Sequence, residues 1–254
     1  MGARNLREML KWQEPMPDMI PKLLHYVWVG GPLPEDRQAF LETWRQTNPD
    51  YTIVHWGNHN ISDFKEPMIE EAFKQRKWAK VADIVRLLAV HQQGGIYLDT
   101  DFEVIRPLDN LLRNACFYGF QQIESTPDWI ANGAFGATPR HWFIRDALNR
   151  LLNMHSGYWE RPTAFGPKLI TQLLRENGLQ TYSPRGVKVK DVYLCPVPVF
   201  YPYHWTETYR PNCIRPETVA VHHWAEVPSF YANLPAPIRY ARLGLRALKR
   251  AVGR

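Results

Sequence analysis

The sequence predicts an α/β protein whose central sheet is mixed, mostly parallel and flanked by helices on both faces. Segments with the alternation of strands recur between segments with helical spacing, which is typical of sheets built with crossover helices. In addition, the apolar run Ile96-Tyr97-Leu98 ends abruptly at two carboxylates, Asp99 and Asp101. Because ligands bind at the carboxyl ends of the strands in such sheets, this run predicts a central strand with a site at its end.

The expected elements alternate along most of the chain. We expect strands at 24–29, 51–56, 96–98, 102–105, 116–121 and 133–138, and helices at 34–46, 67–74, 78–93, 141–154 and 167–177. Residues 51–56 alternate as a half-buried strand does, whereas 78–93 has the apolar spacing of an amphipathic helix. Asn48-Pro49 ends the first helix, and Gly94-Gly95 ends the helix before the central strand. Five prolines between 184 and 211 indicate that 192–203 is rich in loops.

Asp99 and Asp101 are the main candidates for a metal site. In an extended chain, side chains two residues apart project to the same side. Two carboxylates held together are unfavourable unless a cation or donor groups neutralise them. A hard divalent ion, Mn²⁺ or Mg²⁺, prefers such oxygen ligands. An isolated Asp-x-Asp is more often a solvated turn, so the prediction depends on the strand that precedes it.

Asp83 and Arg86 lie three residues apart on one face of the helix that precedes the central strand. Taken alone, this spacing favours a surface ion pair worth well under about 1 kcal/mol. The functional interpretation is that Asp83 accepts a hydrogen bond from a sugar hydroxyl and that Arg86 binds a sugar or phosphate oxygen.

Two further sites need the rest of the chain to interpret them. Asn132, in Asn132-Gly133, is by itself more typical of a turn than of a sugar-binding amide. Of the adjacent His222 and His223, at most one can face a metal if they lie in a strand. His223 precedes Trp224 and is the better candidate for packing, which leaves His222 as the metal ligand.

The composition is that of an ordinary globular protein. The 254 residues are 45% hydrophobic and 22% charged, which excludes a disordered chain. The three cysteines are widely spaced and odd in number, so we expect neither a disulfide framework nor a zinc site. The first residues lack the apolar core of a secretory signal, and no run is long enough to span a bilayer. These features predict a cytoplasmic protein that is soluble or peripheral on the inner face of the cell membrane.

The positive charge is concentrated at the C-terminal end. The chain carries a net charge of +6. Its six basic residues after position 238 have no acidic residue among them: Arg239, Arg242, Arg246, Lys249, Arg250 and Arg254. Apolar residues recur at helical steps beside them, so 238–254 predicts a basic amphipathic helix for an anionic membrane surface. A helix docked on its own domain and a nucleic-acid contact remain open, with nucleic acid the least favoured.

The order of these motifs resembles that of the DXD-containing sugar transferases of glycosyltransferase family 32, and more distantly that of the large glucosylating toxins. The matching segments are Ile20–Gly31, Trp44, Asn48–Tyr51, the Asp83/Arg86 helix, Gly94–Asp101, Arg106–Asp109 and Val221–Trp224. Two positions depart from the family pattern. Phe165 stands where many relatives have Thr before Gly-Pro, and Phe230 stands where many have Trp after Ser.

This resemblance implies a GT-A fold that uses a nucleotide-sugar donor, a divalent metal and retention of anomeric configuration. By position, Trp28 would stack on the donor base, with Val27 beside it, and Asp83 and Arg86 would hold the donor. Asn132 would contact the donor sugar. Asp99 would touch ribose and metal, Asp101 would ligate the metal directly, and His222 would be a further ligand. Asp101, Arg86 and Asp83 are thereby the expected catalytic residues.

We therefore expect three regions: an N-terminal helix and linker at 1–19, a GT-A catalytic domain at 20–237, and the basic helix at 238–254. The expected partners are a UDP- or GDP-sugar, a saccharide or lipid-linked acceptor, and an anionic membrane. The expected role is transfer of a hexosyl group in cell-surface polysaccharide synthesis. Two alternatives remain, namely a metal-dependent nucleotidyl- or phosphotransferase, and a non-catalytic protein that binds carbohydrate or nucleic acid. The first lacks a Gly-rich Lys-Ser/Thr loop.

Overall fold

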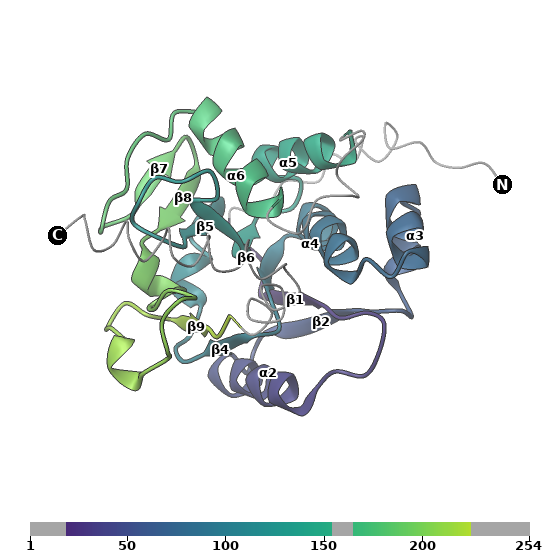
Figure 1. Cartoon of the computed structure of the whole chain (residues 1–254), viewed down its shortest axis with the longest axis horizontal. Coiled ribbons are helices and arrows are strands. Elements are labelled where there is room, and N and C mark those ends of the chain that lie inside the picture. The colour runs from purple at the N-terminus through teal and green to yellow at the C-terminus, as the bar shows by residue number, and fades with distance from the viewer. Residues whose placement is uncertain (1–18, 154–164, 225–254) are drawn as a thin grey trace, which may run out of the picture.

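A seven-stranded mixed sheet organises residues 19–153 and 165–224, which are the residues that this computed structural model describes (Figure 1). Its strand order is β2-β1-β3-β6-β5-β8-β7. The strands are β1 (Leu23–Val27), β2 (Thr52–Trp56), β3 (Gly95–Leu98), β5 (Cys116–Phe120), β6 (Ile130–Ala137), β7 (Val187–Val189) and β8 (Val192–Cys195). A separate two-stranded sheet pairs β4 (Phe102–Val104) with β9 (Ala220–His222).

Within the described ranges, the sheet is flanked by five helices: α2 (Glu35–Thr47), α3 (Pro67–Lys74), α4 (Trp78–Gln93), α5 (Trp142–Leu152) and α6 (Phe165–Glu176). Helices α3 to α6 cover one face, while α2 and the β4–β9 sheet lie on the other (Figure 1). Each face buries its own apolar cluster. Val85 and Leu88 of α4 pack into the first cluster, and Trp44 of α2 packs with Phe102 in the second. The GT-A-type fold that the sequence predicts is confirmed.

The direction of the strands changes in the middle of the sheet. The pairs β1–β2, β1–β3 and β5–β8 are parallel, whereas β3–β6, β5–β6 and β7–β8 are antiparallel. The sheet is mixed, as expected, but its antiparallel share is larger than the strand–helix alternation indicates. Two of these antiparallel pairs arise because β6 runs against both of its neighbours, and the third joins β7 to β8. Neither arrangement is visible in the periodicity of a single strand.

The turn between α4 and β3 needs both of its glycines. Gly94 and Gly95 have φ angles of 68° and 96°, a region that other residues rarely adopt. A Cβ on Gly94 would lie 2.7 Å from Cδ of Pro139, and a Cβ on Gly95 would lie 2.8 Å from Cβ of Leu23. The two glycines therefore end α4 and let β3 enter the sheet immediately, which carries the chain directly to Asp99.

Strand β4 of the small sheet has hydrogen-bonding partners along both of its edges. On one edge, β4 pairs with β9 in the register Phe102↔His222. On the other edge, side chains of α2 take the place of a strand: Nε1 of Trp44 donates to the carbonyl of Phe102 at 2.8 Å, and Oγ1 of Thr43 accepts from the amide of Val104 at 3.0 Å. Helix α2 thus fixes the segment that follows Asp101.

The expectations for the elements are confirmed to within a few residues at most positions, with one clear exception. The segment 192–203, expected to be loops, contains β8 and a 3₁₀ turn at Val197–Val199, and β7 precedes it. Pro196 follows β8 directly, so the prolines end this strand without preventing it. Pairing with β5 and β7 supplies the stabilisation that the local sequence does not indicate.

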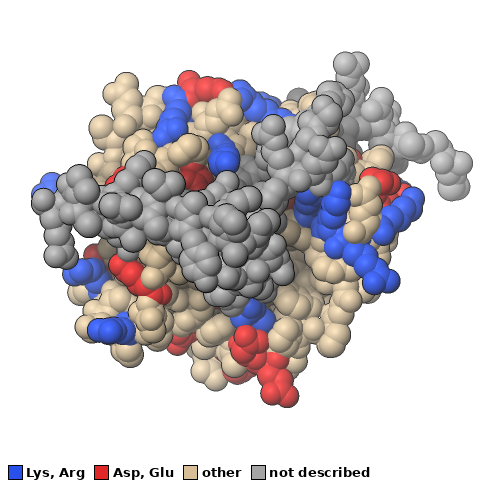
Figure 2. Space-filling view, in the orientation of Figure 1, with Lys and Arg blue, Asp and Glu red and all other residues tan. Residues whose placement is uncertain are grey.

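The expected N-terminal helix and linker and the basic helix at 238–254 lie outside the described residues, apart from Met19. None of the helices in the described ranges combines the length and the apolar content that crossing a bilayer requires. On the visible face, acidic and basic side chains are interspersed rather than segregated (Figure 2).

Candidate active site

Asp99 and Asp101 follow β3 at the carboxyl edge of the sheet. The backbone turns between them, because the amide of Phe102 donates to the carbonyl of Asp99 at 3.1 Å. This turn, rather than the alternation of an extended chain, brings the two carboxylates together. The amide of Asp99 in turn donates to the carbonyl of Gly133 on β6 at 2.8 Å. The position of Asp99 is therefore set by the antiparallel β3–β6 pairing.

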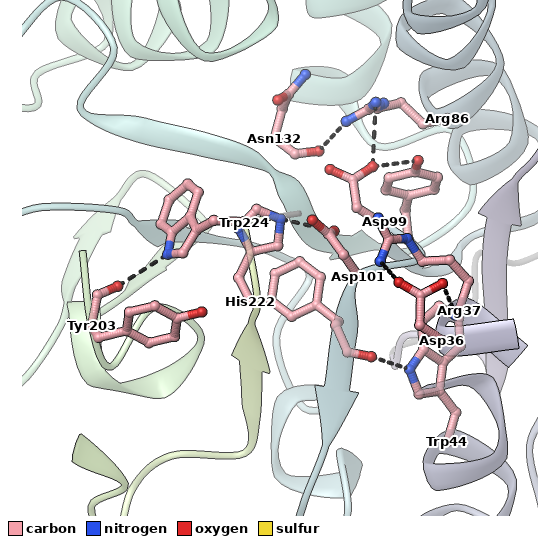
Figure 3. A network of polar contacts seen from close by, with 12 residues as sticks. Asp36, Arg37, Trp44, Arg86, Asp99, Asp101, Asn132, Tyr203, His222 and Trp224 are labelled. Atoms are coloured by element: carbon pink, nitrogen blue, oxygen red, sulfur yellow. Dashed lines mark hydrogen bonds and ion pairs between the residues drawn. The ribbon is translucent and has the colours of Figure 1, made fainter. Parts of the chain in front are cut away.

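His222 completes a group of three possible metal ligands. Each residue of the group Asp99, Asp101 and His222 offers one ligand atom, and these atoms lie within 4.8 Å of one another. Nε2 of His222 is 2.9 Å from Oδ1 of Asp101 (Figure 3). Among the described residues, nothing hydrogen-bonds to the buried Nδ1 of His222.

This donor set fits a divalent cation. Two carboxylates and one imidazole are ligands of Mn²⁺ and related ions. Burial raises the pKa of Asp99 above its ordinary value, although Arg86 opposes the shift, and the neighbouring Asp101 adds to it. A bound cation would remove this conflict by favouring both ionised carboxylates. The three metal ligands expected from the sequence, Asp99, Asp101 and His222, are thus brought together in space.

Arg86 joins the separate parts of the site. Its guanidinium lies 3.5 Å from Oδ1 of Asp83. It also lies 3.4 Å from Oδ1 of Asp99 and donates to the carbonyl of Asn132 at 2.8 Å (Figure 3). Its Nε also donates to the carbonyl of Ala82. The guanidinium of Arg86 therefore connects α4 to the end of β3 and to β6. The interpretation of Asp83 and Arg86 as a surface ion pair is wrong, because the two residues are only 8% and 7% exposed.

Asp83 and Asn132 form the second part of the cluster. Nδ2 of Asn132 donates to Oδ1 of Asp83 at 3.3 Å. Burial raises the pKa of Asp83, and the charge of Arg86 opposes this shift. Asn132 lies within β6 rather than in a turn, so the turn interpretation of Asn132-Gly133 is also wrong. A carboxylate and an amide side by side can accept and donate hydrogen bonds, as sugar hydroxyls require.

Three neighbours of this cluster were not assigned roles from the sequence. The hydroxyl of Tyr97 donates to Oδ1 of Asp99 at 2.7 Å, and the guanidinium of Arg86 lies 4.7 Å from the centre of the Tyr97 ring. A Cβ on Gly133 would lie 2.6 Å from Oδ2 of Asp99, so Gly133 leaves the space that this carboxylate occupies. Likewise, a Cβ on Gly166 would overlap the side-chain amide of Asn132, so Gly166 leaves space for this amide. The Gly-Gly-Ile-Tyr-Leu motif could have indicated Tyr97. Gly133 is identified only by the pairing of β3 with β6, and Gly166 only by the packing of α6 against β6.

Val27 and Trp28 lie where β1 ends, beside β3. The side chain of Val27 is buried in the apolar cluster of α4. Trp28 is partly buried, and its Nε1 donates to the carbonyl of Gly31 at 3.1 Å. This bond holds the indole against the loop that follows β1, at the same edge of the sheet as Asp99.

A comparison with protein families places the acidic motif in a known context. Residues 34–118 match the family model described as the glycosyltransferase sugar-binding region containing the DXD motif. Asp83, Arg86, Asp99 and Asp101 lie inside the matched range, whereas Asn132 and His222 lie beyond it. The resemblance to the DXD-containing glycosyltransferases of family 32 is confirmed.

Curated proteins similar to this chain include sugar transferases of fungi. The chain is 30% identical to the mannosyl phosphorylinositol ceramide synthase SUR1 of Saccharomyces cerevisiae over 152 residues, which cover 58% of the chain and 38% of that protein. It is 27% identical to the inositol phosphoceramide mannosyltransferase 1 of Schizosaccharomyces pombe over 170 residues, covering 61% and 51%. The match to each relative therefore spans about half of its length or less.

Among solved structures, the chain is similar to the one titled PaToxG glycosyltransferase. The TM-score is 0.52 at 20% sequence identity, and the match covers 63% of this chain and 70% of that one. At this identity, the likeness concerns the fold.

Proposed function

We propose, from the confirmed resemblance to the DXD-containing glycosyltransferases of family 32, that this chain transfers a hexosyl group from a nucleotide-sugar donor with the help of a divalent metal. The acceptor is a saccharide or a glycolipid, and the anomeric configuration is retained. One observation carries the proposal: the ligand atoms of Asp99, Asp101 and His222 gather within 4.8 Å beside the buried Arg86 cluster. A cation at these ligands, next to groups that can bind sugar hydroxyls, would suit this reaction.

The chemistry of the leaving group explains the positive charge that the site needs. Breaking the bond between sugar and diphosphate builds negative charge on the diphosphate. When bound, Mn²⁺ or Mg²⁺ neutralises that charge as a Lewis acid, with an effect of several kcal/mol. Asp99, Asp101 and His222 would hold the ion, and Asp99 would also contact the ribose.

The residues around Arg86 orient the donor. Arg86 already holds two carboxylates, so its guanidinium is fixed before a donor enters. Such prior organisation lets it bind a phosphate or sugar oxygen without rearrangement. Asp83 and the amide of Asn132 would bind hydroxyls of the donor sugar, and Trp28 would stack on the base. Asp83, Arg86 and Asp101 are the catalytic residues of this proposal.

The relatives support the sugar and acceptor classes. The names of the fungal relatives state a mannosyl group and an inositol phosphoceramide. A hexose donor and a lipid-linked or saccharide acceptor are therefore our proposal for this chain, in the synthesis of cell-surface polysaccharide or glycolipid.

Donor hydrolysis without an acceptor tests the function. The purified chain is incubated with a panel of UDP- and GDP-sugars in Mn²⁺, and the released nucleotide is measured. We expect slow release from one donor, together with a rise in melting temperature by mass action. A nucleotidyl- or phosphotransferase would cleave a different bond of the donor, and a non-catalytic binding protein would release nothing. Either result would overturn the proposal.

The basic segment 238–254 is the proposed membrane contact, on the inner face of the cell membrane. Each Lys or Arg contributes about 1 kcal/mol near an anionic surface, so six suffice for reversible adsorption. Co-sedimentation with phosphatidylserine vesicles, with and without residues 238–254, tests this. Loss of salt-sensitive binding on truncation supports it. If the full chain does not bind vesicles and the truncation lowers the melting temperature, the segment is a docked helix instead. If the full chain is retained more strongly on DNA or RNA than on vesicles, the segment is a nucleic-acid contact.

A further inference from the structure

A second acid–histidine pair lies directly beside the candidate metal ligands. Nε2 of His223 is 2.9 Å from Oε2 of Glu103. Glu103 follows Asp101 by two residues on β4, and His223 follows His222 directly at the end of β9. The pair therefore joins the two chain segments that carry Asp101 and His222, without being part of the ligand group itself.

The His223 ring is held from three directions. Besides Glu103, it stacks on Phe40 of α2 with ring centres 4.7 Å apart and an interplanar angle of 6°. The ring of Tyr209 meets it edge to face at 4.9 Å. Its backbone amide donates to the carbonyl of Asp101 at 2.9 Å. His223 thus contacts α2, the segment of Asp101 and the loop before β9 at one point.

We infer that the Glu103–His223 pair positions Asp101 and His222 for metal binding. This inference rests on the metal site of the proposed function. It assigns Glu103 and His223 a positioning role and gives neither of them contact with substrate or metal.

The short length of the small sheet is the physical reason why such a device is needed. The β4–β9 pair has three residue pairs in register, and His222 stands at its end. Ends of short strands open easily because few hydrogen bonds hold them. If the end of β9 moved away from β4, the 2.9 Å approach of His222 to Asp101 would be lost. The Glu103–His223 pair closes the sheet one residue beyond His222 and so resists this opening.

The inference is tested with three single variants and one control. The measured quantity is the Kd for Mn²⁺ alone, obtained from the electron paramagnetic resonance signal of the free ion. Glu103→Ala removes the pair. Glu103→Gln removes the charge, but its amide oxygen still accepts from His223. His223→Phe keeps the ring on Phe40 and removes the donor. The control Glu42→Ala removes the same charge from an exposed ion pair with Arg45 on α2.

We expect Glu103→Ala and His223→Phe to raise the Kd for Mn²⁺ by about tenfold or more, the scale seen when partners of metal ligands are removed. Glu103→Gln and Glu42→Ala should stay within about threefold of the wild type, because neither breaks the contact. The double variant Glu103→Ala/His223→Phe should bind no more weakly than either single one. Melting temperatures in EDTA are measured alongside, to confirm that every variant is folded.

Each other outcome has a definite meaning. If Glu103→Gln weakens binding as much as Glu103→Ala, the effect is one of charge, and the positioning role is overturned. If all variants bind as the wild type does, the inference also fails, while the metal site stands. If the wild type itself binds no Mn²⁺, the metal site of the proposed function fails, and the inference fails with it.

Discussion

The imidazole of His222 lies against the carboxylate of Asp101, with Nε2 and Oδ1 2.9 Å apart. The two residues lie on the two segments that form the small sheet, Asp101 just before β4 and His222 at the end of β9. Both are nearly buried, at 5% and 9% exposure, so little solvent reaches the contact between them. Under the proposed function the two side chains would hold a cation where these segments meet, so replacing either one should affect chemistry more than folding.

Replacing Asp101 by Asn should remove transfer and leave the fold intact. The amide keeps the size of the side chain but loses the negative charge that attracts a divalent cation. Loss of several kcal/mol of charge stabilisation lowers the rate by about a hundredfold or more. Turnover in saturating Mn²⁺ and circular dichroism measure the two effects. Full activity of the folded variant would show that Asp101 does not hold the metal.

Replacing Gly133 by Ala should weaken metal binding by displacing Asp99. The new Cβ would lie 2.6 Å from Oδ2 of Asp99, closer than such contacts allow. Gly31→Ala is the matched control, because a Cβ at Gly31 meets no atom within 4 Å. We expect the Kd for Mn²⁺ to rise for Gly133→Ala and to remain unchanged for Gly31→Ala. Equal Mn²⁺ affinities in the two variants would contradict the placement of Asp99 in the metal site.

Replacing Arg86 by Ala should destabilise the protein as well as weaken donor binding. The change leaves Asp83 buried without its main cationic partner, and breaking a buried pair in this way costs about 3–5 kcal/mol. Arg45→Ala is the control, since Arg45 pairs with Glu42 in solvent and such a pair contributes about 1 kcal/mol at most. Urea unfolding of both variants measures the difference. Similar losses in the two would mean that the Arg86 network does not stabilise the fold.

Replacing Trp28 by Ala should weaken nucleotide binding by about 1–3 kcal/mol, the scale of stacking between a base and an aromatic ring. Trp28→Phe keeps a ring and should lose less. Isothermal titration with UDP and GDP measures the effect, and the melting temperature shows whether the indole is instead needed for packing. A folded Trp28→Ala variant with unchanged nucleotide affinity would rule out stacking at this residue.

Acid should destabilise the protein through His25. Burial lowers the pKa of His25 to about 4, while its Nε2 lies 2.8 Å from the carbonyl of Gly94 and its Nδ1 accepts from Nε1 of Trp56. Because the folded state favours the neutral ring, its contribution is complete above the unfolded pKa of about 6.5 and is lost as the pH falls towards 4. The full loss is about 3 kcal/mol. Urea unfolding between pH 7 and 4 should show a shallower pH dependence for His25→Gln, and equal slopes would contradict the assignment.

The sequence by itself determined most of the fold and the identity of the acidic motif. Local features were sufficient there: the apolar spacing of α4, the paired glycines at 94 and 95, and the run that ends at Asp99 each depend on neighbours along the chain. The family resemblance added Asn132 and His222, which no local pattern identifies. The pairing of Phe102 with His222 of β9 could not be predicted from the sequence, because pairing between distant strands leaves no periodic signal.

Only the tertiary structure decided which of these residues are buried and which of them are in contact. Spacing cannot distinguish an exposed ion pair from the buried Asp83–Arg86 pair, since burial depends on what packs above the helix. Likewise, the prolines around β8 indicated loops, but pairing with β5 outweighed them. The partners of Asp99, which are Tyr97, Gly133 and Arg86, come from β3, β6 and α4, and the contact of Glu103 with His223 joins β4 to the end of β9. Charge and hydrogen bonding act across space, so a chemical site becomes defined only when the chain has folded around it.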